Sequence, residues 1–96
     1  MPRSLSIHRS VVTPNDRPKF FDRLRTREAH FQRLGCRYWV FEEKGLQGAF
    51  VEFCEANDAE SLAAAHAASP DPVLDPARIY CLVELSSFSA ASSSTA

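Results

Sequence analysis

Hydrophobic and polar positions alternate near the start of the chain. In residues 4–12, SLSIHRSVV, the apolar positions Leu5, Ile7 and Val11 are separated by polar ones. Such alternation is typical of a half-buried β-strand. The next residues, TPNDRP, favour a turn, because proline cannot donate a ladder hydrogen bond and Asn and Asp side chains bond to nearby backbone. We therefore expect a first strand that ends in a turn.

The pattern changes to that of a helix over residues 19–34. An apolar stripe recurs there on a charged background, formed by Phe20, Leu24, Phe31 and Leu34. Gly35 follows, where a left-handed helix cap costs little. We expect the arginines of this helix, Arg27 among them, to face solvent, and also His30 at the margin of the stripe.

Two aromatic and β-branched runs, CRYWVFEE (36–43) and GAFVEFCE (48–55), are separated by KGLQ, which predicts a hairpin. With residues 44–47 as the loop, Glu43 lies opposite Gly48. One face of the hairpin then carries Trp39, Phe41, Phe50 and Glu52. The other face carries Tyr38 and Phe53.

Residues 57–69, NDAESLAAAHAAS, predict a second helix of good helix formers, with Asn57 or Asp58 as its N-cap and Pro70 as its end. Residues 77–88, ARIYCLVELSSF, return to strand alternation. The last residues, SAASSSTA (89–96), contain nothing to bury, so we expect a flexible low-complexity tail.

The element order is β-α-β-β-α-β, which predicts an α+β domain over residues 1–88. It corresponds to the ferredoxin-like split βαβ fold, a four-stranded antiparallel sheet with two helices on one face. The uncovered face would carry Trp39, Phe41, Phe50 and Glu52. Because such an aromatic patch is unusual on a monomer, we expect it to form the interface of a homodimer.

Composition narrows the classes of partner. A chain of 96 residues forms one domain with a thin core, and its net charge of -1 gives no reason to expect nucleic acid or a membrane surface. No apolar run approaches the roughly 20 residues that cross a bilayer, and no signal peptide is recognisable, so we expect a cytoplasmic protein. Three widely spaced cysteines predict neither a disulfide framework nor a metal site.

Several segments together resemble the antibiotic biosynthesis monooxygenase-like proteins of the dimeric α+β barrel superfamily. They are KFFDRLR, LGCRYWVFEE, GAFVEFCEAND and AESLAAAHAASP, and the resemblance covers about residues 5–85. Its most specific part is the pattern E-x-x-D-x-x-x-L-x-x-x-H-x-x-S-P, matched here by Glu55, Asp58, Leu62, His66, Ser69 and Pro70.

The resemblance implies small homodimers with pockets between each sheet and its own helices. Some members oxidise quinol-like or anthrone-like compounds with molecular oxygen and no metal or flavin. Others bind heme through a histidine at the place of His66, and also use a first-strand asparagine and a tryptophan near the pocket. Residues 4–13 contain no asparagine, and Trp39 is expected on the far face. We therefore expect no cofactor, with heme the alternative.

His66 and Tyr38 are the candidate catalytic residues. His66 shares a helical stripe with Leu62, so it faces the sheet, where a neutral imidazole could accept a proton. Tyr38 could donate a hydrogen bond to a developing anion. Both residues also fit a structural role. The expected ligand-binding residues around them are Leu24, Phe31 and Phe53.

Two functions remain open at this point. One is cofactor-independent oxidation of a small aromatic substrate in a pocket between sheet and helices. The other is a non-catalytic homodimeric module that binds a small molecule or serves in a stress response. An open apolar cavity beside His66 and Tyr38 would favour the enzyme, and a filled pocket would favour the binding module.

Overall fold

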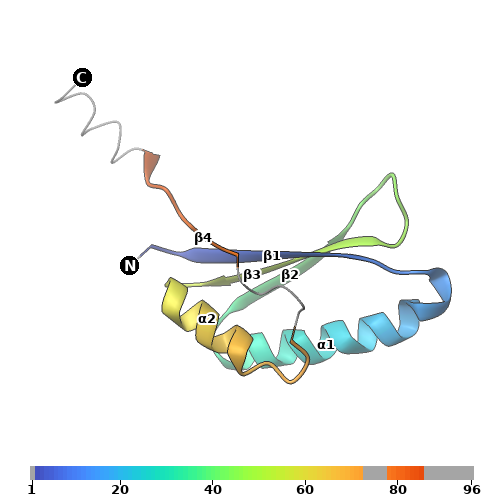
Figure 1. The fold of residues 1–96 in the computed structure, drawn as a ribbon, viewed down its shortest axis with the longest axis horizontal. Coiled ribbons are helices and arrows are strands. Elements are labelled where there is room, and N and C mark those ends of the chain that lie inside the picture. The colour runs from blue at the N-terminus through green and yellow to red at the C-terminus, as the bar shows by residue number, and fades with distance from the viewer. Residues whose placement is uncertain (1, 73–77, 86–96) are drawn as a thin grey trace.

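The computed structural model describes residues 2–72 and 78–85. The elements are, in order, β1 (Ser4–Val11), a 3-10 turn (Pro14–Asp16), α1 (Arg17–Arg33), β2 (Arg37–Glu42), β3 (Ala49–Ala56), α2 (Ala59–Ala67) and β4 (Ile79–Cys81). The strands form one antiparallel sheet in the order β2-β3-β1-β4, and both helices lie on the same side of it (Figure 1). The predicted α+β architecture is confirmed, and it is compatible with a ferredoxin-like fold. The expected tail, residues 89–96, lies outside the described residues.

Local sequence signals set the end of α1 and the start of α2 where they were expected, whereas α1 begins at Arg17, two residues earlier than predicted. Gly35 follows α1 with a φ of 80°, and the N–H of Cys36 bonds back to the carbonyl of Phe31 at 2.9 Å, as in a Schellman cap. Asp58 is the N-cap of α2, because its carboxylate accepts the Ser61 N–H at 2.7 Å. These caps direct the chain from each helix back to the sheet.

The loop between β2 and β3 is one residue longer than predicted. The N–H of Glu43 bonds to the carbonyl of Ala49 at 2.8 Å, so the loop extends to Gly48. Gly48 has a φ of 88°, and a Cβ at this position would overlap the carbonyl oxygen of Val12. The loop is thereby fastened to the end of β1 in a way that only glycine permits. This contact selects the longer loop.

A shift of one residue turns every side chain of β3 to the opposite face. Phe50 and Glu52, which were expected in the dimer interface, instead lie buried beneath the helices. Phe53, which was expected in the pocket, lies on the outer sheet face, the face away from the helices. Trp39 and Phe41 of β2 lie on the outer sheet face, as predicted.

The first strand turns its serines toward the helices. Ser4 and Ser6 are buried, whereas Leu5 and Ile7 lie half-buried on the outer sheet face. The alternation therefore predicted the strand, and it is the polar side of this strand that faces the helices. The sheet is polar inside along β1 and apolar outside.

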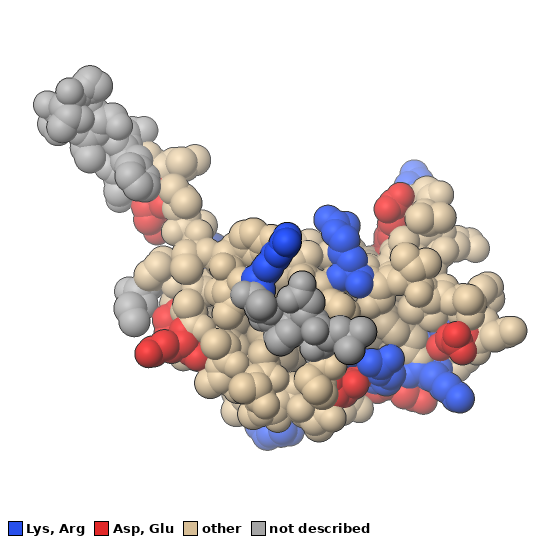
Figure 2. All heavy atoms as spheres, in the orientation of Figure 1, with Lys and Arg blue, Asp and Glu red and all other residues tan. Residues whose placement is uncertain are grey.

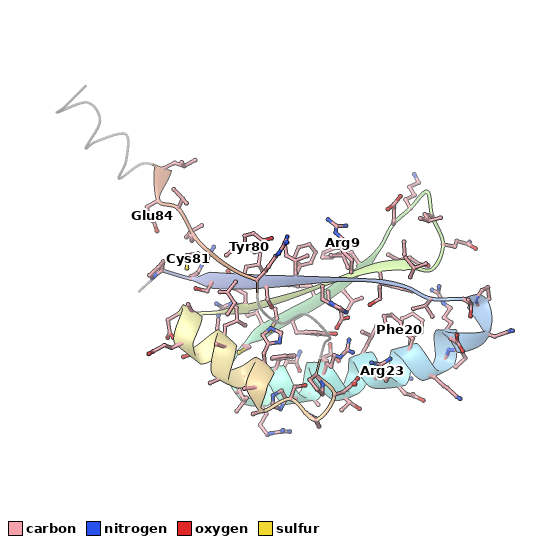
Figure 3. All side chains as sticks on the ribbon, viewed as in Figure 1. Arg9, Phe20, Arg23, Tyr80, Cys81 and Glu84 are labelled. Carbon is pink, nitrogen blue, oxygen red and sulfur yellow. The ribbon has the colours of Figure 1, made fainter. Side chains whose placement is uncertain are left out.

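The apolar core consists of two separate clusters between the sheet and the helices. The first cluster is formed by Phe20, Leu24 and Phe50. The second is formed by Phe31, Cys36, Cys54, Ala56, Leu62 and Ala65. Figure 3 shows Phe20 directed from α1 toward the sheet, while Arg9 and Tyr80 project from the outer sheet face. Along both α1 and β3, a charged residue separates the two clusters.

The exposed side of α1 carries mixed charge. Arg25 pairs with Asp22 at 2.6 Å, and both side chains are well exposed. In the view of Figure 2, basic and acidic groups are interspersed over α1 rather than gathered by sign. This surface is a solvent face, as predicted for most of its arginines, with Arg27 the exception.

Candidate functional site

A polar pocket lies between the two apolar clusters. We use this name for the cavity lined by Ser6, His8, Arg27, Phe31, Tyr38, Glu52, Cys54, His66, Ser69 and Asp71. These residues come from β1, α1, β2, β3, α2 and the connector that follows α2. The site is therefore assembled by the whole fold rather than by one sequence motif.

Arg27 and Glu52 form a buried ion pair in the polar pocket. The Arg27 Nη1 donates to both carboxylate oxygens of Glu52, at 2.8 and 2.7 Å, and the two side chains are 3% and 5% exposed. Removing each charge from water costs several kcal/mol, which the pair offsets only while both partners are present. Burying two charges is costly for a domain with a small apolar core. Clusters of buried ionisable groups are common at functional sites.

Tyr38 completes this cluster from β2. Its hydroxyl donates to Oε1 of Glu52 at 2.6 Å, and its ring stacks on Phe31 with the centroids 5.8 Å apart. Burial, and then the hydrogen bond to Glu52, raise the pKa of Tyr38 well above its usual value. The phenol consequently stays protonated and can act as a hydrogen-bond donor.

Asp71 connects the ion pair to the segment that follows α2. The Arg27 Nε donates to the backbone oxygen of Asp71 at 3.1 Å. Arg23, one turn earlier on α1, binds the Asp71 carboxylate at 3.0 Å, and the Asp71 N–H bonds to the Ser69 hydroxyl at 3.3 Å. The connector is thus held against α1 at the border of the polar pocket.

His66 projects from α2 into the same pocket. Its Nε2 lies 2.7 Å from the hydroxyl of Ser6 on β1, and its ring meets the Phe31 ring edge-on at 5.0 Å. Burial lowers the pKa of His66 below the usual value of 6.5, an effect partly opposed by the negative charge of Glu52. The imidazole is therefore neutral near pH 7 and able to accept a proton.

The thiol of Cys54, beside the pocket, is held in its protonated form. Burial, followed by the neighbouring Cys36, raises the pKa of Cys54 to about 12. The nucleophilic form of cysteine is the thiolate, which is scarcely populated at neutral pH when the pKa is this high. Cys54 therefore serves as a packing residue in the second apolar cluster.

The enclosed space in the polar pocket has a volume of about 10 Å³, room for about one water molecule. A heme would not fit this space. In addition, the Nε2 atom of His66, a usual iron-binding atom, is held by Ser6. The residues present therefore do not match a heme site, and a flat organic molecule would require the side chains around the cavity to move apart.

The structure brings together three of the predicted site residues. His66, Tyr38 and Phe31 all border the polar pocket. Leu24 does not reach it, because it packs in the first apolar cluster with Phe20. Phe53 is on the outer sheet face, because the longer loop shifts the register of β3 by one residue.

Six polar residues that line the pocket were not predicted there, namely Ser6, His8, Arg27, Glu52, Ser69 and Asp71. Arg27 was expected in solvent and Glu52 in a dimer interface, while Ser6 and Asp71 carried no recognisable signal. The stripe of α1 held a clue, since Arg27 stands between Leu24 and Phe31 with helical spacing. His30 is similarly buried, with Nε2 donating to the Ala65 carbonyl at 2.8 Å, so the expectation of a solvated His30 was wrong.

Within residues 2–72 and 78–85, no group of three or more His, Cys, Asp or Glu side chains could hold a metal ion. None of the helices in this part of the chain is both long enough and apolar enough to cross a membrane. A scan against protein-family models and searches of curated proteins and of solved structures find no match. The site is therefore interpreted from its own chemistry.

The buried ion pair predicts a distinctive double-variant result. Arg27→Met is expected to lower the free energy of unfolding by about 3–5 kcal/mol, because Glu52 stays buried without its partner. Arg27→Met combined with Glu52→Leu removes both charges and is expected to regain most of that loss. Urea unfolding followed by circular dichroism measures both. Arg25→Met, on the exposed side of α1, is the control, with a change of about 0.5 kcal/mol or less. A double variant as unstable as the single one would contradict this account.

His66 predicts a loss of stability in mild acid. Because its folded-state pKa is lowered below 6.5, the unfolded chain binds a proton before the folded protein does. The free energy of unfolding should therefore decrease as the pH falls below 6.5, and this decrease should be smaller in His66→Gln. A ring titration followed by NMR gives the midpoint directly. A midpoint at or above 6.5 would be inconsistent with the buried, neutral imidazole.

Proposed function

We propose that the polar pocket binds a small hydroxylated aromatic or enolic molecule and that His66 accepts a proton from it. The observation that carries this proposal is the meeting of two complementary groups at one cavity. His66 is a neutral base, and the cluster of Arg27, Glu52 and Tyr38 supplies fixed donors and charge. A base placed beside preorganised donors is the arrangement that proton abstraction requires.

The charge cluster would stabilise both products of the proton transfer. The substrate anion can be held by N–H groups of Arg27, whose guanidinium has five donors, while the Tyr38 hydroxyl keeps Glu52 in place through its bond to Oε1. The protonated His66 is favoured by the negative charge of Glu52, which acts on it in the folded protein. Because these groups are already fixed in place, little reorganisation is needed as charge develops.

The reaction that best uses such an anion is oxidation by molecular oxygen without metal or flavin. The substrate supplies the electrons. With an anthrone, a CH₂ group becomes C=O by taking one oxygen atom, and the second oxygen atom leaves as water. The protein contributes the proton acceptor, the anion's donors and the exclusion of water. This is the chemistry implied by the resemblance to the antibiotic biosynthesis monooxygenase-like proteins.

The small size of the cavity favours a second candidate function. A space of about 10 Å³ is too small for an aromatic ring unless the surrounding side chains move. The same pocket could therefore belong to a non-catalytic module that binds a small polar molecule. The two functions differ in one observable, since only the enzyme consumes oxygen when the ligand is added.

We also propose that the protein is a homodimer joined through the outer sheet faces, in a dimeric barrel arrangement. Large apolar side chains gather on that face and beside it, and they include Trp39 (43% exposed), Phe41 (56%), Tyr80 (49%) and Leu82 (44%). Charge at one end of the face is compensated within the chain, because Arg37 pairs with Glu55 at 2.6 Å. An apolar patch with a paired charge at one end suits a second copy of the same surface.

Oxygen uptake over a panel of anthrones and quinols tests the catalytic proposal. The wild-type protein should consume oxygen, and His66→Gln should be slower by roughly 10²- to 10⁴-fold, because it lacks a proton acceptor. Added hemin should change neither rate. Gln32→Ala, on the exposed side of α1, is the control for handling and folding. If a compound of the panel binds but no oxygen is consumed, the enzyme proposal is wrong and the binding module is supported.

Light scattering at micromolar concentration tests the homodimer. The wild type should have twice the mass of the chain. Phe41→Glu should weaken association by roughly 30-fold or more while the monomer stays folded, since this side chain is exposed in the isolated chain. Leu34→Glu places the same charge on another exposed apolar residue, at the end of α1, and should not affect the mass. A monomeric wild type would overturn the dimer.

A further inference from the structure

The bond between Ser6 and His66 has no part in the function proposed so far. We propose that Ser6 holds His66 with its proton on Nδ1, and that the Ser6 hydroxyl passes the substrate's proton to Nε2. This inference rests on the proposed function and assigns Ser6 a role as a positioning residue and proton relay. The Ser6 oxygen lies 2.7 Å from Nε2, which is hydrogen-bond distance for direct transfer.

Ser6 is held rigidly by the sheet. It lies in β1, an inner strand of the sheet, and pairs with Cys54 of β3 on one side and Ile79 of β4 on the other. It is 6% exposed, so it lies inside the protein at the wall of the polar pocket. A hydroxyl fixed by two ladders keeps its geometry to the imidazole constant.

A hydroxyl is suited to this task because it donates one proton and accepts others at the same oxygen. In the proposed step, the substrate O–H bond breaks as a new O–H bond forms on the Ser6 oxygen. At the same time the original Ser6 O–H bond breaks and an N–H bond forms at Nε2. The substrate gains one negative charge, His66 gains one positive charge, and Ser6 ends as a neutral hydroxyl.

The charged and titratable groups around His66 act in both directions. Glu52 favours the imidazolium, while Arg27, His8 and His30 oppose it. Burial, the largest influence on His66, also lowers its pKa, so the imidazolium formed in the step releases its proton readily. Ser6 itself adds no charge, so it directs the proton without changing this balance.

NMR on ¹⁵N-labelled protein tests the tautomer in the absence of any substrate. Above the titration midpoint of His66, the wild type should show Nδ1 protonated and Nε2 bare. Ser6→Ala should lose this preference, and Ser6→Thr, which keeps a hydroxyl, should retain it. Ser4→Ala is the matched control. It removes another buried serine hydroxyl from the same face of β1, one that bonds to the Pro2 carbonyl instead of a histidine. A wild type protonated on Nε2 would overturn the proposal.

Kinetics test the relay. With any substrate that the wild type oxidises, Ser6→Ala should reduce kcat by roughly 10- to 100-fold with little change in KM, and Ser6→Thr should recover most of the rate. Equal rates in wild type and Ser6→Ala would overturn the relay while leaving the proposed function intact. If the wild type oxidises nothing, the proposed function fails and the relay fails with it, whereas an Nδ1 proton lost in Ser6→Ala would still support the positioning role.

Discussion

The buried ion pair between Arg27 and Glu52 is the constraint on which the rest of this structure depends. It divides the core into two apolar clusters, orders Tyr38 through a hydrogen bond and ties the connector after α2 to α1. A chain of this length has little apolar area with which to offset two desolvated charges. The fold therefore places a buried ion pair at the wall of the polar pocket, where a ligand could contact it.

Much of the architecture followed from the sequence, because the periodicities and caps are local. Gly35 and Asp58 act at the positions that the pattern indicated. The side chains of β3 that face the helices could not be predicted from the sequence. They depend on the length of the loop between β2 and β3, which is one residue longer than expected. The cause is tertiary: Gly48 contacts Val12, which lies far away in sequence. With the longer loop, Glu52 lies in the pocket and not on the outer sheet face, where a dimer interface was expected.

The site was only partly predictable for a related reason. His66 was identified from helical spacing and Tyr38 from the alternation along β2, and both residues border the polar pocket. Arg27 was not identified, because nothing in the local sequence of a charged helix indicates that one of its arginines pairs with a carboxylate of the sheet. Ser6 was not identified, because it lies on the polar side of an alternating strand. In β1 the polar side is inside, since the polar pocket needs hydroxyl and imidazole groups there.

Asp71 is bound to α1 in two ways that constrain sequence change differently. Its backbone oxygen, which every amino acid supplies, accepts from Nε of Arg27 at 3.1 Å. Its carboxylate pairs with Arg23 at 3.0 Å and also lies 3.3 Å from Nε of Arg27. Over evolutionary time, loss of that carboxylate would weaken both pairs, but Arg27 would keep its bonds to the backbone oxygen and to Glu52. Positions 27 and 52 lack such a substitute, so in a set of relatives they should change as a pair or stay fixed.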